Sequence, residues 1–327
     1  MIYNYKKIIY FLLTSLFFSC NNLNEKKSYQ NFAVVSAKIE ASKAGHKILK
    51  MGGNAFDAMI ATDLALSVVY PNAGNLGGGG FMVYRLNDSR NGSLDYRERA
   101  PIRASESMYL DENGNVIKNL SSEGALSIGV PGTVAGLFEV YERFGSIPLD
   151  SIFQPALSLA KNGFPLTKSQ ATLFNLHKNK ILLNSDSINL FLKDFKKEMI
   201  FKNIPLYNTL KYILQNGKDG FYNGKISDEI LKYLSNKGSI LNKQDFISYK
   251  PKWRNPFVFQ FDDLKVITMG LPSSGGIVMS QILKSLELLS LDQFKQRDLK
   301  FIKTFSLNIF VIYRVLLGVG LLVIAYL

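Results

Sequence analysis

A run of glycines is the segment whose residue types most directly offer chemistry. Residues 74–80 read Gly-Asn-Leu-Gly-Gly-Gly-Gly, and successive backbone N–H groups in such a run can cradle an anion. The run lacks the Gly-Lys-Ser/Thr ending of a phosphate loop, and it precedes a predicted strand instead of opening a helix. Glycine also permits a positive φ or a close approach of two backbones. Taken alone, the run favours this second, conformational role.

Residue types that commonly serve as nucleophiles and metal ligands form no recognisable set. The serines of the segment 272–276, Pro-Ser-Ser-Gly-Gly, are not in a Gly-x-Ser-x-Gly nucleophile elbow. His46 and His177 are the only histidines of the chain. Neither has a histidine or cysteine partner at metal-ligand spacing, so the sequence predicts no metal site.

The charge of the chain is strongly positive. Its 327 residues carry a formal net charge of +13. Lysines account for most of this charge and are spread through helix-like segments, for example at 178–180 and 193–197. A nucleic-acid site would gather basic residues and stacking aromatics on one face. The pattern is typical of a solvated, lysine-rich surface and predicts no nucleic-acid partner.

Several helices and strands must position these segments. Apolar spacing predicts a helix over 41–51, and a nearly continuous apolar run over 58–69 predicts a buried helix capped by Asn54. Strands are predicted at 32–36, 81–85, 93–97, 257–261 and 264–268. Further helices are predicted at 133–144, 149–161, 168–178, 207–215, 227–235 and, as a buried helix, 277–289. This interleaving predicts an α/β or α+β fold.

Residues 1–20 read as a signal peptide. Lys6 and Lys7 precede a short apolar stretch at 8–18, which Ser19 and Cys20, the only cysteine of the chain, then end. A lone cysteine in this place is typical of a bacterial lipobox, although the preceding phenylalanines are bulkier than usual, and an ordinary signal peptide is the alternative. We expect lipidation of Cys20, a polar linker over 21–31, and export to the periplasm or cell envelope.

Several motifs follow one another along the chain. They are Ala-Ser-x-x-Gly-x-x-Ile-Leu-x-x-Gly-Gly-Asn-Ala-x-Asp-Ala at 41–58, the glycine run within 71–81, Asp-Tyr-Arg-Glu-Arg-Ala-Pro at 95–101, Gly-Val-Pro-Gly-Thr-Val-Ala-Gly-Leu at 129–137, Gly-Phe-Tyr-x-Gly at 220–224, the stretch 241–245, Arg-x-Pro at 254–256 and Pro-Ser-Ser-Gly-Gly at 272–276. In this order they resemble the large subunit of the γ-glutamyltransferase (glutathione hydrolase) family. The resemblance assigns residues 32–300 to one large-subunit-like domain.

The resemblance implies an N-terminal-nucleophile hydrolase with an αββα sandwich. In such a family a precursor cleaves itself, and the new N-terminal threonine of a small subunit attacks the γ-glutamyl amide with help from its own α-amine. The glutamyl group passes from glutathione or a related compound to water or to an amine, and no cofactor is needed. This chain would form a partial sandwich, incomplete without a small subunit as its partner.

Arg97 is the site residue that the resemblance places on this chain. By match of motif it takes the position of the arginine that binds the α-carboxylate of the γ-glutamyl group. A guanidinium offers a carboxylate a bidentate fork, which supports the assignment. The alternative is a surface arginine in a local charge cluster of Arg97, Glu98 and Arg99.

The sequence departs from the family where the nucleophile is concerned. None of its later threonines is followed by the family's Thr-Thr/Ser-His pattern; these are Thr167, Thr172, Thr209, Thr268 and Thr304. We therefore expect the chain to stop before the catalytic threonine, to hold no catalytic residue and to be inactive alone. Two rival functions remain open: a non-catalytic envelope lipoprotein that keeps the fold, and a β-lactam acylase of the same superfamily.

Residues 301–327 form an apolar tail in which the resemblance has faded. Their apolar residues favour membrane insertion by about 0.3–0.6 kcal/mol each, against a cost of about 3 kcal/mol for Arg314. Basic residues just before the tail favour the cytoplasmic side, however, which conflicts with an exported domain. The tail is therefore interpreted either as a membrane helix or as the product of a shifted reading frame.

Lipidation of Cys20 can be tested directly. In a bacterial host, radiolabelled fatty acid should enter the protein and should be absent from Cys20→Ser, because the thiol is the acylated atom. Equal labelling of the variant would contradict the lipoprotein interpretation.

Overall fold

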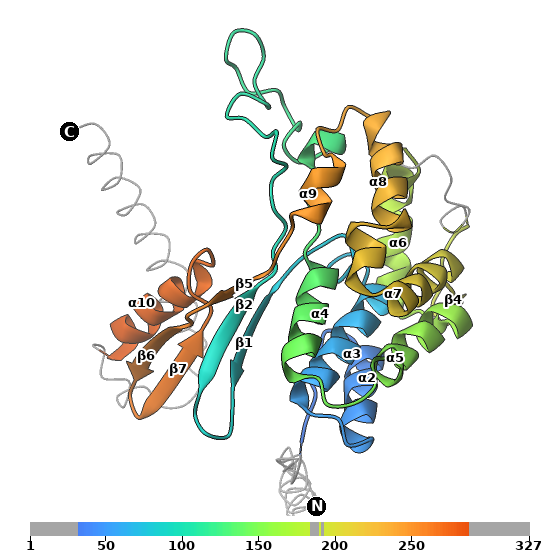
Figure 1. Cartoon of the computed structure of the whole chain (residues 1–327). Coiled ribbons are helices and arrows are strands. Elements are labelled where there is room, and N and C mark those ends of the chain that lie inside the picture. Colours follow the sequence, from blue (N-terminus) through green and yellow to red (C-terminus); the bar gives the residue numbers. More distant parts are fainter. Residues whose placement is uncertain (1–31, 184–189, 191–192, 288–327) are drawn as a thin grey trace, which may run out of the picture. The chain divides into compact units, whose positions relative to one another are not determined.

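Two consecutive helices, α2 (Ile39–Lys50) and α3 (Ala55–Val69), open the structure, a computed structural model that describes residues 32–183, 190 and 193–287 (Figure 1). Asn54 caps α3 as predicted, because its side chain accepts hydrogen bonds from the backbone N–H groups of Phe56 and Asp57. The Asp57 carboxylate accepts in turn from the Asn54 N–H, which completes a capping box. Apolar residues on all sides of α3 are buried, which confirms the prediction from its continuous apolar run.

The remaining helices are the 3₁₀ turn η1 (Ala125–Ser127), α4 (Thr133–Phe144), α5 (Leu149–Asn162), α6 (Lys168–Leu183), α7 (Ile204–Tyr222), α8 (Lys225–Ser235), α9 (Lys243–Ile247) and α10 (Gly275–Glu287). The sequence predicted all of these except η1 and α9, although α6 and α7 are longer than predicted. Helices α3, α4, α5 and α7 pack on one another, as Figure 1 shows. Their facing sides bury the main apolar core.

Three short antiparallel sheets accompany the helices. The first has the strand order β1-β2-β5 and joins β1 (Phe81–Arg85), β2 (Asn91–Asp95) and β5 (Lys252–Arg254). The others pair β3 (Phe164–Pro165) with β4 (Ile200–Phe201), and β6 (Phe257–Phe261) with β7 (Leu264–Thr268). In the first sheet Leu94 of β2 lies opposite Trp253 of β5. A fold that mixes helices and strands is the predicted class.

An aromatic cluster packs the first sheet against α3 and α4. The Phe56 and Phe144 rings stack with centroids 4.1 Å apart, and Tyr84 of β1 meets both rings edge-on. Trp253 of β5 joins the cluster and donates its indole N–H to Glu139 of α4 at 2.7 Å. Aromatic pairs of this kind add to the stabilisation from buried area. The cluster therefore fixes the first sheet, whose strand β2 leads into the Arg97 segment, on α3 and α4.

Two predictions about strands are wrong. Residues 32–36 form no strand, since their apolar run has no neighbouring strand with which to pair. Strand β2 begins and ends two residues earlier than predicted because the chain turns tightly before it, where Leu86 N–H donates to Arg90 C=O at 2.7 Å. Arg97 consequently lies beyond the strand and not at its end.

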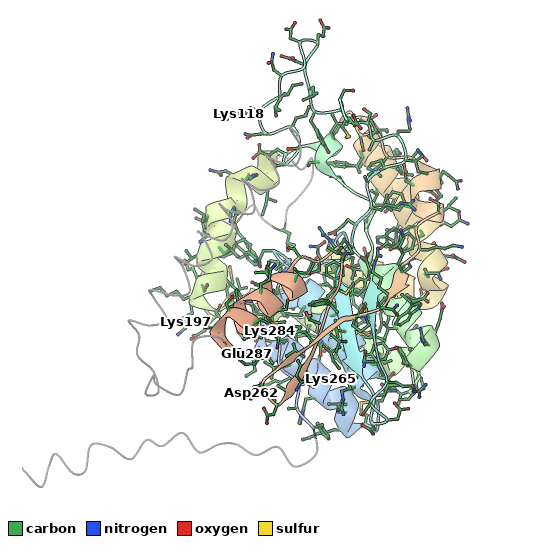
Figure 2. The ribbon with its side chains drawn as sticks, turned by 90° about the vertical axis from the view of Figure 1, so that its left-hand side faces the viewer. Lys118, Lys197, Asp262, Lys265, Lys284 and Glu287 are labelled. Carbon is green, nitrogen blue, oxygen red and sulfur yellow. The ribbon has the colours of Figure 1, made fainter. Side chains whose placement is uncertain are left out.

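Helix α10 was predicted to be buried and is not. Among its described residues Gly276 is the buried one, whereas Ile277, Met279 and Ile282 are between 36% and 43% exposed. Strand β6 packs against this helix. A single strand covers only one side of a helix, so the apolar residues on the other sides of α10 stay partly exposed. The end of the helix is tied to the β6–β7 turn, since Glu287 accepts from the Asp262 N–H and pairs with Lys284 (Figure 2).

The described helices include none that is both long and apolar enough to cross a membrane. The predicted signal peptide with Cys20, the predicted linker at 21–31 and the apolar tail at 301–327 all lie outside the described residues.

Candidate functional site

The glycine run meets the main chain of Tyr96 at very short range. Gly80 and Tyr96 exchange two backbone hydrogen bonds, at 3.0 and 3.2 Å. A Cβ atom on Gly79 would lie 2.5 Å from the Tyr96 carbonyl oxygen. Residues 77–80 all avoid positive φ. Of the two conformational reasons for the run, close approach of two backbones is therefore the one that applies.

The N-terminus of α4 packs on the point where the glycine run crosses the main chain of Tyr96. The Gly78 carbonyl accepts from the N–H groups of Gly132 and Thr133 at 2.7 and 3.0 Å, so it satisfies two of the donors that a helix N-terminus leaves open. These donors are thereby occupied and do not face a ligand. A Cβ on Gly136 would lie 2.3 Å from the Tyr96 ring. The motifs at 71–81, 95–101 and 129–137 therefore meet at Tyr96.

Asp63 of α3 lies beneath this crossing and accepts a hydrogen bond from the buried Tyr96 hydroxyl. Burial raises the pKa of the Asp63 carboxyl to about 6, against the lowering effect of that hydrogen bond. Burial, followed by the nearby Asp63 charge, also raises the pKa of the Tyr96 hydroxyl. Sequence reasoning did not find Asp63, although it is the one acidic residue inside the apolar run at 58–69.

Arg97 follows Tyr96 and is exposed. Its main chain is held at both ends, because its N–H donates to Asp95 at 3.1 Å and its carbonyl accepts from the Tyr249 hydroxyl at 2.7 Å. Its guanidinium lies over the Phe81 ring, 5.7 Å from the centroid. Within the part of the chain that the structure describes, this guanidinium makes no hydrogen bond or salt bridge. The backbone of Arg97 is thus fixed, while the N–H groups of its guanidinium have no partner among the described residues.

Two neighbouring arginines have structural partners instead. Arg99 donates to the Ser248 hydroxyl at 2.6 Å and to the Asp245 carbonyl at 3.1 Å, so its side chain leaves Arg97 and joins the α9 segment. Arg254 binds the Asp95 carboxylate at 2.8 Å, and the Asp95 side chain is only 10% exposed. The side chain of Arg99 is therefore engaged elsewhere, and Arg97 keeps an exposed guanidinium without a polar partner among the described residues.

Comparison with known proteins shows to which family the chain belongs. The family model described as Gamma-glutamyltranspeptidase matches residues 41–308. The chain belongs to the γ-glutamyltranspeptidase family. It is 40% identical to a glutathione hydrolase proenzyme of Pseudomonas aeruginosa over 77% of its own length and 45% of that relative's, and 38% identical to that of Escherichia coli over 78% and 44%. It thus spans about half the length of the curated relatives it matches.

Solved structures agree with this assignment. The fold superposes on Helicobacter pylori γ-glutamyltranspeptidase with a TM-score of 0.80 and 39% identity, covering 83% of this chain and 78% of that one. It also matches γ-glutamyltranspeptidase from Pseudomonas nitroreducens with a TM-score of 0.76 and 36% identity, covering 85% and 83% of the two chains. These matches confirm the N-terminal-nucleophile hydrolase fold class. A cephalosporin acylase from Bacillus halodurans, at 22% identity and a TM-score of 0.68, shares the fold alone.

A cavity of about 750 Å³ lies elsewhere in the chain, between α6, α8 and the segment 122–128. Its wall is mostly apolar, and Arg97 is not among the residues that line it. Across the described ranges, no three His, Cys, Asp or Glu side chains gather in a way that could hold a metal ion. The candidate site therefore rests on Arg97 and its supports and not on a cavity.

The raised pKa of Asp63 predicts a pH dependence of stability. In the unfolded chain the carboxyl ionises near its ordinary pKa of 3.8, whereas the folded protein keeps it protonated up to about pH 6. Ionisation between these values favours the unfolded state, so the free energy of unfolding should fall by about 1–3 kcal/mol as the pH rises from about 4 to 6. Urea denaturation across this range should show that fall, and Asp63→Asn should lack it.

Asp88 provides a control of opposite sign. Hydrogen bonds from Arg90 lower the pKa of this exposed carboxyl, so its contribution to stability is present at neutral pH and is lost as the pH falls. The fall in stability between pH 4 and 6 should persist in Asp88→Asn. Parallel stability curves for the wild type and Asp63→Asn would contradict the assignment of the buried acid.

Proposed function

We propose that the complete protein transfers the γ-glutamyl group of glutathione and related compounds to water, amino acids or peptides, and that this chain supplies the side of the site that binds the donor carboxylate. The observation that carries the proposal is the exposed Arg97 guanidinium, which makes no polar contact within the described residues although its main chain is held on both sides. Membership of the γ-glutamyltranspeptidase family and relatives named glutathione hydrolase support it.

In this proposal the present chain binds the donor and a small subunit attacks it, as charge and geometry suggest. A guanidinium on a fixed backbone can give two parallel N–H···O bonds to the donor's α-carboxylate and so set the direction of the γ-amide. A small subunit would add the N-terminal threonine, whose own α-amine serves as the base. The proposed chemistry needs no cofactor. The donor is thus oriented by one subunit and attacked by the other.

Two other functions compete with this one. One is a non-catalytic lipoprotein that retains the fold. A β-lactam acylase is favoured only by likeness of fold, and the motif around Arg97 favours the transferase. For any of the three we also propose export to the periplasm or cell envelope and a lipid anchor at Cys20, with the tail at 301–327 as a second membrane contact.

The first experiment asks whether this chain acts alone. We expect purified residues 21–327 to release no glutamate from glutathione, because they contain no threonine hydroxyl with its own free α-amine at the site. Addition of a small subunit from an intact relative should restore release. Glutamate release above the buffer rate by the chain alone, free of contaminating enzyme, would contradict the proposed division.

Arg97→Lys is the second experiment, made in the assembled enzyme. Lysine keeps the charge but loses the bidentate fork, and a hydrogen bond to a charged group contributes about 1.5–3 kcal/mol. Donor KM should therefore rise about tenfold to a hundredfold, while acceptor KM changes little. Arg97→Ala should raise it at least as much.

The matched control is Arg103→Lys, since Arg103 is also exposed and lies nearby in sequence. Arg99→Ala is not a clean control, because Arg99 binds Ser248 and Asp245 and its loss would disturb the fold. An equal rise in KM for Arg103→Lys would indicate that replacement of any exposed arginine of this segment has the effect, and not the loss of the bidentate fork at Arg97. An unchanged donor KM in Arg97→Lys would remove Arg97 from the site.

A further inference from the structure

We infer that Tyr249 is a positioning residue for the donor, which acts by holding the carbonyl group of Arg97. This inference rests on the proposed function, since it assumes that Arg97 binds the donor. The Tyr249 hydroxyl donates to the Arg97 carbonyl oxygen at 2.7 Å, from a segment 152 residues further along the chain. Tyr249 follows the short helix α9, where its N–H donates to the Phe246 carbonyl at 3.0 Å.

Tyr249 is itself rigidly placed. Its side chain is almost fully buried, and its ring stacks on that of Tyr222 with centroids 5.6 Å apart and an interplanar angle of 7°. The Tyr222 hydroxyl donates to the Pro131 carbonyl at 2.8 Å and accepts from the Ala135 N–H at 3.2 Å. The Tyr249 hydroxyl is therefore connected, through one ring stack, to the same N-terminal turn of α4 that packs on Tyr96.

The surroundings also keep Tyr249 in the form that donates. Burial, followed by the carboxylates of Asp95 and Glu98, raises the pKa of its hydroxyl, although Arg99 opposes this effect. A protonated phenol can give its hydrogen to a carbonyl oxygen, whereas a phenolate cannot. The hydrogen bond to Arg97 therefore persists throughout the physiological pH range.

Arg97 depends on this contact because its side chain has no polar support of its own. The exposed guanidinium rests on the Phe81 ring, and within the described residues no acidic side chain binds it. The direction of the fork is thus set by the main chain of Arg97. That main chain is fixed by Asp95 at its N–H and by Tyr249 at its carbonyl. Removal of either contact should misalign the fork without removing its charge.

Tyr249→Phe in the assembled enzyme tests the inference. Phenylalanine keeps the ring and its stack on Tyr222 but cannot donate to the Arg97 carbonyl. Donor KM should rise about threefold to tenfold, the effect of one lost neutral hydrogen bond. Acceptor KM and kcat should change less than twofold, and thermal denaturation should show that the variant is folded. A merely structural role would lower the amount of folded enzyme and leave donor KM unchanged.

Tyr109→Phe is the matched control, because the Tyr109 hydroxyl also donates to a backbone carbonyl, that of Leu126 at 3.2 Å, and does not contact Arg97. Its donor KM should stay within twofold of the wild type. The double variant Arg97→Lys/Tyr249→Phe should show no further rise beyond Arg97→Lys, since residues that act as one unit are not additive.

The outcomes separate this inference from the proposed function. If Arg97→Lys raises donor KM and Tyr249→Phe does not, the positioning role of Tyr249 is wrong and the proposed function stands. Additive effects in the double variant would also overturn that role, because Tyr249 would then act independently of Arg97. If Arg97→Lys itself leaves donor KM unchanged, the proposed site is wrong before Tyr249 is considered.

Discussion

The main chain of Tyr96 is packed so closely by its neighbouring segments that only glycine fits where they touch it. A Cβ atom would lie 1.8 Å from the Tyr96 carbonyl oxygen if it were added to Gly132, and 2.5 Å from it if added to Gly79. Contacts this short are impossible between real atoms, so any larger residue there would force the glycine run or α4 away from the crossing. The placement of Arg97, the next residue in the chain, depends on this packing.

Around the crossing, polar groups are paired by chain segments that lie far apart in sequence. Arg254 binds Asp95, Arg99 binds the α9 segment, and Asp63 accepts from the Tyr96 hydroxyl. In the described residues no buried side-chain nitrogen or oxygen lacks a partner. Because unpaired buried polar groups are costly, such complete pairing makes the region rigid. The Arg97 guanidinium stands outside this paired set, since it is exposed and makes no polar contact within the described residues.

The sequence motifs that are typical of the family lie close together in the folded chain. The motifs at 71–81, 95–101, 129–137 and 254–256 are separate in sequence, and the structure brings them together around Tyr96 and Arg97, where Tyr249 joins them. Glycines in these motifs permit close packing, and their polar residues hold the backbone. The chain spans about half the length of its curated relatives, so this cluster is one side of the proposed site.

The sequence by itself determined the helices other than η1 and α9, the strand pairs β1–β2 and β6–β7 apart from the exact ends of β2, the Asn54 cap and the family. These features depend on apolar periodicity, on capping and turn residues, and on motif order, all of which are expressed within short stretches of chain. Tertiary structure alone decided the irregular conformation of 32–36 and the exposure of α10, because a strand and a buried face both require neighbours. It also decided the contacts of Asp63 and Tyr249 with the Arg97 segment. The Tyr249 contact joins residues 152 positions apart, and neither partner carries a local signal for the other, so only the packed chain could bring them together.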